Sequence, residues 1–346
     1  MTQNALTAST ERPISRVRVV TPIPLGLAVL LAGAGGFLMN IAFPSAAVWP
    51  AAFVAIALLL VALRGRRLGG AFLVGLVYGA VFFFLLVSWT ARYLGPIPWA
   101  ALASLQAILM VTAMLLITLA YRWLPRAWPG GRLIALPALV GALWTVQELF
   151  LGNWPYGGFP WARVGMTQSE SPLAHVTSWV GVSGLSFLIV TAVAMIVELV
   201  VAGEWRRPVR LIVPAALVLV LFITPLFPTA VVGEMRIGAV QGNGTTGYFD
   251  DREPYGVIGA QTDATEPLIG EDVDLLVWPE GGVDYDPFQD EFTARKLTRV
   301  VSRVGAPLLA NTATERGDDI FNTSFVWTEE GAATQLHDKR HPVPFG

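Results

Sequence analysis

The chain has 346 residues, of which 54% are hydrophobic and 14% are charged, and its formal net charge is −2. Globular proteins carry about 25% charged residues, so this composition excludes an ordinary soluble protein, and the near-neutral charge argues against nucleic acid or another polyanion as a partner. The chain contains no cysteine, which excludes disulfide bonds and leaves these residues without a thiol nucleophile. The composition therefore predicts a membrane protein.

Apolar stretches that can cross the roughly 30 Å hydrocarbon core of a bilayer follow one another up to about residue 230. We predict that residues 1–21 form a cytoplasmic tail and that residues 22–230 form a transmembrane domain. The domain is expected to contain seven spans, of which the second is short. The predicted spans cover residues 25–43, 48–63, 71–87, 97–121, 133–151, 179–202 and 211–227.

The arginines alternate between the loops that join these spans. Twelve lie before the first span or after the second, fourth and sixth, whereas the intervening loops hold only Arg92 and Arg163. Because short cytoplasmic loops carry the excess of Lys and Arg, the N-terminus is predicted to be cytoplasmic. The first span lacks a small-residue cleavage site, so we expect a retained anchor. Seven crossings would then place everything after residue 227 outside the cytoplasm.

A stretch rich in Gly and Pro, residues 152–161, lies between the fifth and sixth predicted spans and cannot form a regular helix. Irregular backbone at membrane depth must be covered by protein or face water. Two interpretations stay open for its aromatic side chains. They form either a belt at the membrane interface or a platform that binds a lipid substrate. The four aromatic residues are Trp154, Tyr156, Phe159 and Trp161.

From residue 234 the pattern changes to short strand-like runs separated by helix-compatible segments, which predicts a layered α/β domain over residues 234–346. Helices are expected at 253–268 and 287–304. Strands are expected at 235–241, 273–278, 307–312 and 322–327, and Gly331 should turn the chain into a last strand that ends near His341. These elements make a partial set of layers with no closing element.

Two residues of this domain are candidates for chemistry. Glu280 follows an apolar strand directly and precedes two glycines, so a carboxylate that can act as a general base is expected at a strand end. Lys339 is one of only two lysines in the chain, and its ammonium group is suited to stabilising an oxyanion. Taken singly, Pro279–Gly282 is more often an exposed turn, and Asp338–Arg340 is more often a solvated charge cluster.

The histidines and the intramembrane carboxylates are weaker candidates. In an extended chain, His337, Lys339 and His341 share one face, so the histidines are expected to line or flank the lysine pocket. Two histidines without a third ligand argue against zinc, and we expect no metal or cofactor. Glu148 and Glu198 lie in or near predicted spans, where carboxylates are functional candidates. Glu148 is near the outer end of its span, where water can reach it.

Several motifs resemble a known family when taken in order. Residues 277–282 resemble the glutamate motif of the nitrilase superfamily, and residues 337–346 resemble its lysine motif in the form typical of apolipoprotein N-acyltransferases. Residues 239–243 resemble the first nitrilase strand, and residues 158–161 resemble the loop between the fifth and sixth spans. Seven spans before an outer nitrilase-like domain match the layout of that family.

The resemblance implies a polytopic α-helical membrane bundle followed by a partial α/β nitrilase-like domain, part of an α-β-β-α sandwich, in the bacterial inner membrane. It also implies that Glu280 is the general base, that Lys339 stabilises the oxyanion and that a cysteine is the nucleophile. The acyl donor would be a phospholipid, and the acceptor would be the α-amino group of the diacylglyceryl-cysteine that begins an apolipoprotein. Membrane lipid is thus an expected partner, and nucleic acid is not.

The sequence departs from the family at one decisive point. The cysteine, the acidic residue after Phe345–Gly346 and the eighth span that the family places beyond the lysine motif do not occur in these 346 residues. We therefore expect a truncated acyltransferase that cannot turn over as written. The alternative is a non-catalytic membrane protein that binds lipoprotein or lipid. A transporter is disfavoured because the spans hold almost no charged residues.

Overall fold

The structure is a computed structural model, and it describes residues 21–245, 250–251 and 253–341. The predicted cytoplasmic tail, apart from residue 21, and the last five residues of the lysine motif lie outside the described residues. The chain divides into two compact units. A helical unit comprises Met1–Leu86, Leu102–Gly152 and Phe159–Phe227, and an α/β unit comprises Val87–Ala101, Asn153–Gly158 and Pro228–Gly346.

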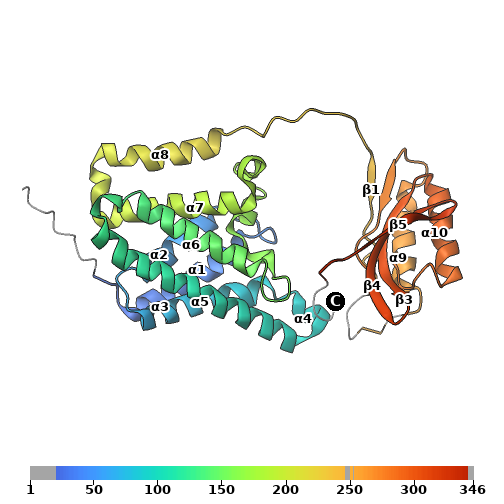
Figure 1. Cartoon of the computed structure of the whole chain (residues 1–346), viewed down its shortest axis with the longest axis horizontal. Coiled ribbons are helices and arrows are strands. Elements are labelled where there is room, and N and C mark those ends of the chain that lie inside the picture. Colours follow the sequence, from blue (N-terminus) through green and yellow to red (C-terminus); the bar gives the residue numbers. More distant parts are fainter. Residues whose placement is uncertain (1–20, 246–249, 252, 342–346) are drawn as a thin grey trace, which may run out of the picture. The chain divides into compact units, whose positions relative to one another are not determined.

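Each of the seven predicted spans overlaps one helix of the membrane region (Figure 1). Four of these helices are long and apolar enough to cross a bilayer. The other three have 13, 17 and 16 residues, so the shortest covers only about 20 Å at 1.5 Å per residue. A helical membrane region is therefore confirmed, whereas seven crossings remain a prediction. The helices are α1 Leu25–Ala42, α2 Ala51–Leu63, α3 Leu68–Leu86, α5 Pro96–Ala127, α6 Ala135–Leu151, α7 Thr177–Ala202 and α8 Pro208–Ile223; the short α4 is Thr90–Leu94.

Small residues bring the helices of this unit close together. A Cβ atom on Gly36 of α1 would lie 2.6 Å from the carbonyl oxygen of Tyr78 in α3, so only glycine fits at this contact. Tyr78 is fully buried and packs edge-on against Trp144 of α6, with 6.5 Å between the ring centroids. Lipid tails are as apolar as these side chains, so close packing rather than exclusion of water holds such helices together.

The carboxylate of Glu198 in α7 is completely buried and is neutralised by two arginines from other segments. Arg64, which follows α2, forms an ion pair with it, and Arg132 donates from Nε to Oε2 at 3.2 Å. The Arg64 guanidinium also stacks over the ring of Tyr121, 4.9 Å from its centroid. Sequence reasoning treated Glu198 as a functional candidate, but these contacts give it a structural role as the tie between three segments.

The α/β unit contains a five-stranded sheet with the order β1-β2-β3-β4-β5. The first three strands are parallel, and β4 and β5 continue the sheet antiparallel. All predicted elements occur, with shorter first strands because only a few residues of β1 and β2 pair. Their bounds are β1 Ile237–Ala239, α9 Gly256–Thr265, β2 Leu275–Val277, α10 Glu291–Val304, β3 Leu308–Arg316, β4 Asp319–Thr328 and β5 Gly331–Asp338.

Helices α9 and α10 pack against one face of this sheet. Ile258 of α9 and Leu297 of α10 join a single apolar cluster with Leu308 and Phe325 of the sheet. The side chain of Asp290 caps α10 by accepting a hydrogen bond from the amide of Thr293 at 2.7 Å. One helical layer and one sheet layer are thus present among the described residues, which accords with a nitrilase-like α/β domain. The candidate catalytic residues lie toward the opposite face.

Candidate active site

Glu280 lies just beyond the carboxyl end of β2, where Gly281 turns the chain with a φ of 65°. Glycine adopts this left-handed conformation without steric cost. One oxygen of the carboxylate, Oε1, accepts two hydrogen bonds, from Lys339 Nζ at 2.7 Å and from Asn322 Nδ2 at 2.8 Å. The carboxylate is 61% exposed, so it lies at an open surface of the α/β unit.

Strand pairing explains why Lys339, so distant in sequence, reaches Glu280. Strand β3 pairs with β2 on one side and with β4 on the other, and β5 pairs with β4. Lys339 follows β5 directly, and its amide donates to the carbonyl of Asn322 at 2.8 Å, which continues the ladder by one residue. The register thus places the lysine beside the carboxylate, as the motif order predicted but the sequence could not demonstrate.

Sequence reasoning missed two asparagines that hold this carboxylate in place. Asn311 in β3, which is 8% exposed, accepts from the amide of Gly281 at 2.8 Å and donates to Asn322 Oδ1 at 2.7 Å. Asn322 in turn donates a hydrogen bond from Nδ2 to Glu280 Oε1. Ser324 also accepts from Asn311, at 3.2 Å. The only sequence signal is that these polar residues alternate with Ala310, Thr323 and Phe325 along their strands, which places them on the face away from the core but does not indicate their role.

These residues line an open cleft of about 310 Å³. Its lining includes the apolar side chains of Trp278 and Leu309 and the polar side chains of Asn322, His337 and Lys339. His337 therefore lies beside the lysine, as predicted. His341 is exposed and is not among the residues that line the cleft, so its predicted role in substrate binding remains a prediction.

Charge pairing keeps Glu280 ionised. The hydrogen bond from the Lys339 ammonium, helped by the Asn322 amide, lowers the pKa of Glu280 below its ordinary value. The neighbouring Asp338 accepts from Arg316 at 2.5 Å and from Thr323 Oγ1 at 2.7 Å, and these bonds likewise lower its pKa. A carboxylate that is ionised at neutral pH can accept a proton, and the ammonium group beside it can donate hydrogen bonds to an oxyanion.

The two ion pairs predict that strand β5 loosens in acid. A lowered folded-state pKa stabilises the fold at pH values above the ordinary values of 4.5 for Glu280 and 3.8 for Asp338, and this contribution is lost as pH falls through the lowered values. Hydrogen-exchange protection factors, corrected for intrinsic rates, should therefore fall in β5 between about pH 6 and about pH 3. Strand β3 should lose less protection, and an equal loss in both strands would contradict the prediction.

Comparisons with known proteins identify the relatives of this chain. A family model described as the apolipoprotein N-acyltransferase N-terminal domain matches residues 35–195. An apolipoprotein N-acyltransferase of Azotobacter vinelandii is 31% identical over 92% of this chain and 63% of its own length. Those of Geobacter metallireducens and Coxiella burnetii are 29% and 28% identical over the same share of this chain. The chain is therefore similar to apolipoprotein N-acyltransferases over most of its length. It spans about 63% to 66% of the length of these curated relatives.

The aromatic loop lies within the region that matches the model of the apolipoprotein N-acyltransferase N-terminal domain. Residues 152–157 form turns, and Pro160–Ala162 is a single turn of 3-10 helix, so the segment is not a regular helix, as predicted. Phe159 and Trp161 stack with 6.0 Å between ring centroids. Trp154 and Tyr156 are 52% and 82% exposed. A belt and a lipid platform both stay open for this loop.

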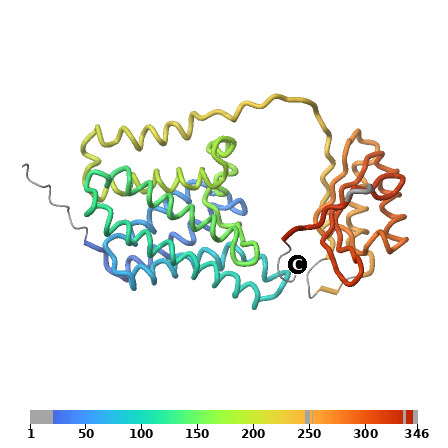
Figure 2. Tube along the Cα trace, in the orientation of Figure 1, coloured from blue at the N-terminus to red at the C-terminus, as the bar shows by residue number. Residues whose placement is uncertain are grey.

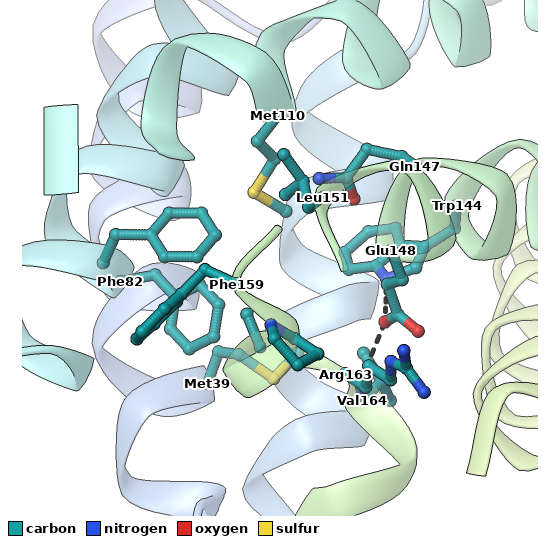
Figure 3. Close-up of a pocket in the computed structure, with 13 residues that line it drawn as sticks. Met39, Phe82, Met110, Trp144, Gln147, Glu148, Leu151, Phe159, Arg163 and Val164 are labelled. Carbon is teal, nitrogen blue, oxygen red and sulfur yellow. Dashed lines mark hydrogen bonds between the residues drawn. The ribbon is translucent and has the colours of Figure 1, made fainter. Parts of the chain in front are cut away.

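Glu148 anchors the part of the loop that follows (Figure 3). Its Oε1 atom accepts from Trp144 Nε1 at 2.9 Å and from the amide of Val164 at 2.8 Å. The expectation that water reaches this side chain was wrong, because Glu148 is only 4% exposed beneath the loop. The adjoining cavity, lined by Phe82, Phe159 and Arg163 among others, measures about 10 Å³ and has room for about one water molecule but no acyl chain.

Replacing Glu148 with alanine is expected to loosen this loop. The change leaves the Trp144 indole and the Val164 amide as buried donors without their acceptor, which should cost about 2–4 kcal/mol of stability. Thermal unfolding in detergent and hydrogen exchange of residues 159–168 would measure the effect. Glu170→Ala is the matched control because Glu170 is exposed in the same loop. Equal effects of the two changes would disprove the anchoring role.

Proposed function

We propose that this chain supplies the membrane platform, the general base and the oxyanion stabiliser of an apolipoprotein N-acyltransferase. The Glu280–Lys339 pair carries the proposal, because a carboxylate and an ammonium group 2.7 Å apart in an open cleft provide two of the three groups that thiol acyl transfer requires. Similarity to relatives that bear this name supports the same reaction.

In the proposed reaction, a cysteine thiol that these 346 residues do not contain loses its proton to Glu280, and the thiolate attacks an ester carbonyl of a phospholipid. A C–S bond forms while Lys339 donates hydrogen bonds to the oxyanion. The ester C–O bond then breaks, and the lysophospholipid oxygen takes up the proton. In the second half, the α-amino group of a diacylated apolipoprotein attacks the thioester, an amide forms and the thiol is released.

The proposal also covers topology. The N-terminus is placed in the cytoplasm and the α/β unit outside it, in the inner membrane of a bacterium. The excess of arginine in alternate loops supports this orientation. The exposed aromatic residues Trp154, Tyr156 and Trp161, together with Phe159 and His341, are proposed to contact the lipid or lipopeptide substrate.

Two preparations test the proposal in one assay. Membranes that contain the protein expressed from its complete open reading frame are incubated with phospholipid labelled in its acyl chains and with a diacylated lipopeptide. Mass spectrometry should detect a lipopeptide that has gained one amide-linked acyl chain. The purified 346-residue polypeptide should give no such product because it has no thiol. Product from this polypeptide would refute the thioester route.

The absence of cysteine favours a second candidate function, a non-catalytic protein that binds lipoprotein or lipid. A binder does not need an ionised base, so Glu280→Gln would leave lipopeptide binding intact, whereas an acyltransferase would lose turnover. Sequencing the gene beyond codon 346 and measuring the intact mass in native membranes would separate the two candidates. A following cysteine supports the enzyme, and a mass of 37.3 kDa supports the binder.

A further inference from the structure

Helices α7 and α8 form a hairpin (Figure 2), and contacts join the two helices at both of its ends. At one end the chain passes from α7 to α8 through the short turn Glu204–Arg206. At the other end Trp179 donates from Nε1 to the carbonyl of Pro225 at 2.7 Å, and the amide of Phe227 donates to Ser178 Oγ at 2.9 Å. The spacing between the two helices is therefore fixed by contacts outside the middle of the hairpin.

Between these fastenings the two helices enclose an apolar groove of about 660 Å³. Its walls include Ile196, Leu199 and Val200 from α7 and Pro214, Val218 and Phe222 from α8. Most of α8 is exposed, and only Pro214 and Leu221 are buried within it. Packed helices leave few voids larger than a water molecule, because unfilled space forfeits dispersion contacts. We therefore expect a hydrocarbon chain to fill this large apolar groove of the membrane region.

One end of the groove is cationic. Trp205 lines the groove, and the guanidinium of Arg206 stacks over its ring, 5.1 Å from the centroid. Arg207 and Arg210 follow at the start of α8, where both side chains are exposed. Glu204 pairs with these last two arginines and offsets one of the three positive charges. Tryptophan and arginine together at the end of an apolar groove match the interface between lipid tails and phosphates.

We propose that the groove between α7 and α8 holds one phospholipid, with an acyl chain between the helices and its phosphate against Arg207 and Arg210. The charged end lies at the C-terminal end of α7, which spans about 39 Å at 1.5 Å per residue. The lipid is a structural ligand of this hairpin and is distinct from the acyl donor of the proposed reaction. The inference does not rest on the proposed enzymatic function.

Photocrosslinking of the intact protein tests the site. The protein is reconstituted in phosphatidylethanolamine vesicles that contain a small fraction of phosphatidylglycerol with a diazirine in one acyl chain. After irradiation, digestion and mass spectrometry, adducts should appear on the groove-facing residues of α7 and α8. Unlabelled phosphatidylglycerol should compete with the probe, whereas diacylglycerol, which has the same chains but no phosphate, should not. Equal competition by the two lipids would overturn the proposed phosphate contact.

Matched variants separate this site from bulk lipid. Val218→Trp fills the groove and should lower the adduct yield about tenfold, whereas Val220→Trp, on the exposed side of the same helix, should not change it. Arg207→Gln with Arg210→Gln should lower the yield by a similar factor of about ten. Ala215→Phe fills the same groove and provides a second test if Val218→Trp does not fold. Unchanged adducts in a folded groove-filling variant would refute the proposal.

Discussion

Glu280→Gln is expected to abolish N-acylation by the protein expressed from its complete open reading frame, with a loss of about 100-fold or more. Glutamine keeps the size of the side chain and can still accept a hydrogen bond from Lys339, but its amide cannot take the proton of a thiol. Lys339 and Asn322 both donate to Oε1 of Glu280, and the amide oxygen of glutamine can take the place of this atom, so the variant should fold normally. The rate is measured as acyl transfer to a diacylated lipopeptide.

The chain provides its own controls for this experiment. Glu329→Gln alters an exposed glutamate in the turn between β4 and β5 and should leave the rate unchanged. Lys339→Met should lower the rate of acyl transfer as strongly as Glu280→Gln does. Lys296→Met removes the only other lysine of the sequence, on helix α10, and should leave the rate unchanged. Acyl transfer retained in Glu280→Gln would refute the role of Glu280 as the general base.

Glu198→Ala is expected to be the most destabilising single change in the helical unit, with a cost of about 3–5 kcal/mol. Removing this buried carboxylate leaves the positive charge of Arg64 in the interior without its counter-charge, and Arg132 loses its partner as well. The single change would therefore remove both ion pairs that join α7 to the segment after α2 and to the segment before α6. Thermal unfolding of the purified protein in detergent would report the loss as a large drop in midpoint temperature.

Glu204→Ala provides the comparison for Glu198. Glu204 also pairs with two arginines, but their side chains are exposed, and an exposed ion pair contributes at most about 1 kcal/mol. The two changes therefore remove the same chemical group from a buried and from an open network. Similar midpoints for both variants would show that the buried network does not hold the helices together.

Asn311 explains why the candidate site was only partly predictable. Glu280 and Lys339 were found because they occur in short motifs with a recognisable order, and a motif keeps its meaning without three-dimensional context. Asn311 and Asn322 carry no motif, and an asparagine in a strand is usually an ordinary solvent contact. Their role follows from the β3–β4 register, in which Asn311 pairs with Ser324 and Ala313 with Asn322. That register brings the amide groups next to the turn at Gly281.

For Glu148, the sequence predicted the position in the span but not the burial of the side chain. The position of this carboxylate near the end of a predicted span was correct, yet its solvation was predicted wrongly. Burial of an end residue depends on which segment folds back over it, and here residues 159–168 return to cover it. No local pattern in residues 135–151 encodes that return.

The sequence by itself determined the membrane class, the positions of the helices and strands, and the two charged candidates, because hydrophobic periodicity and short motifs are local properties of the chain. Only the tertiary structure decided that Lys339 meets Glu280, that asparagines orient the carboxylate, and that Glu148 and Glu198 are buried ties. Each of these facts depends on contacts between residues far apart in the sequence. Strand register and helix packing fix such contacts, and both arise from the cooperation of many side chains at once.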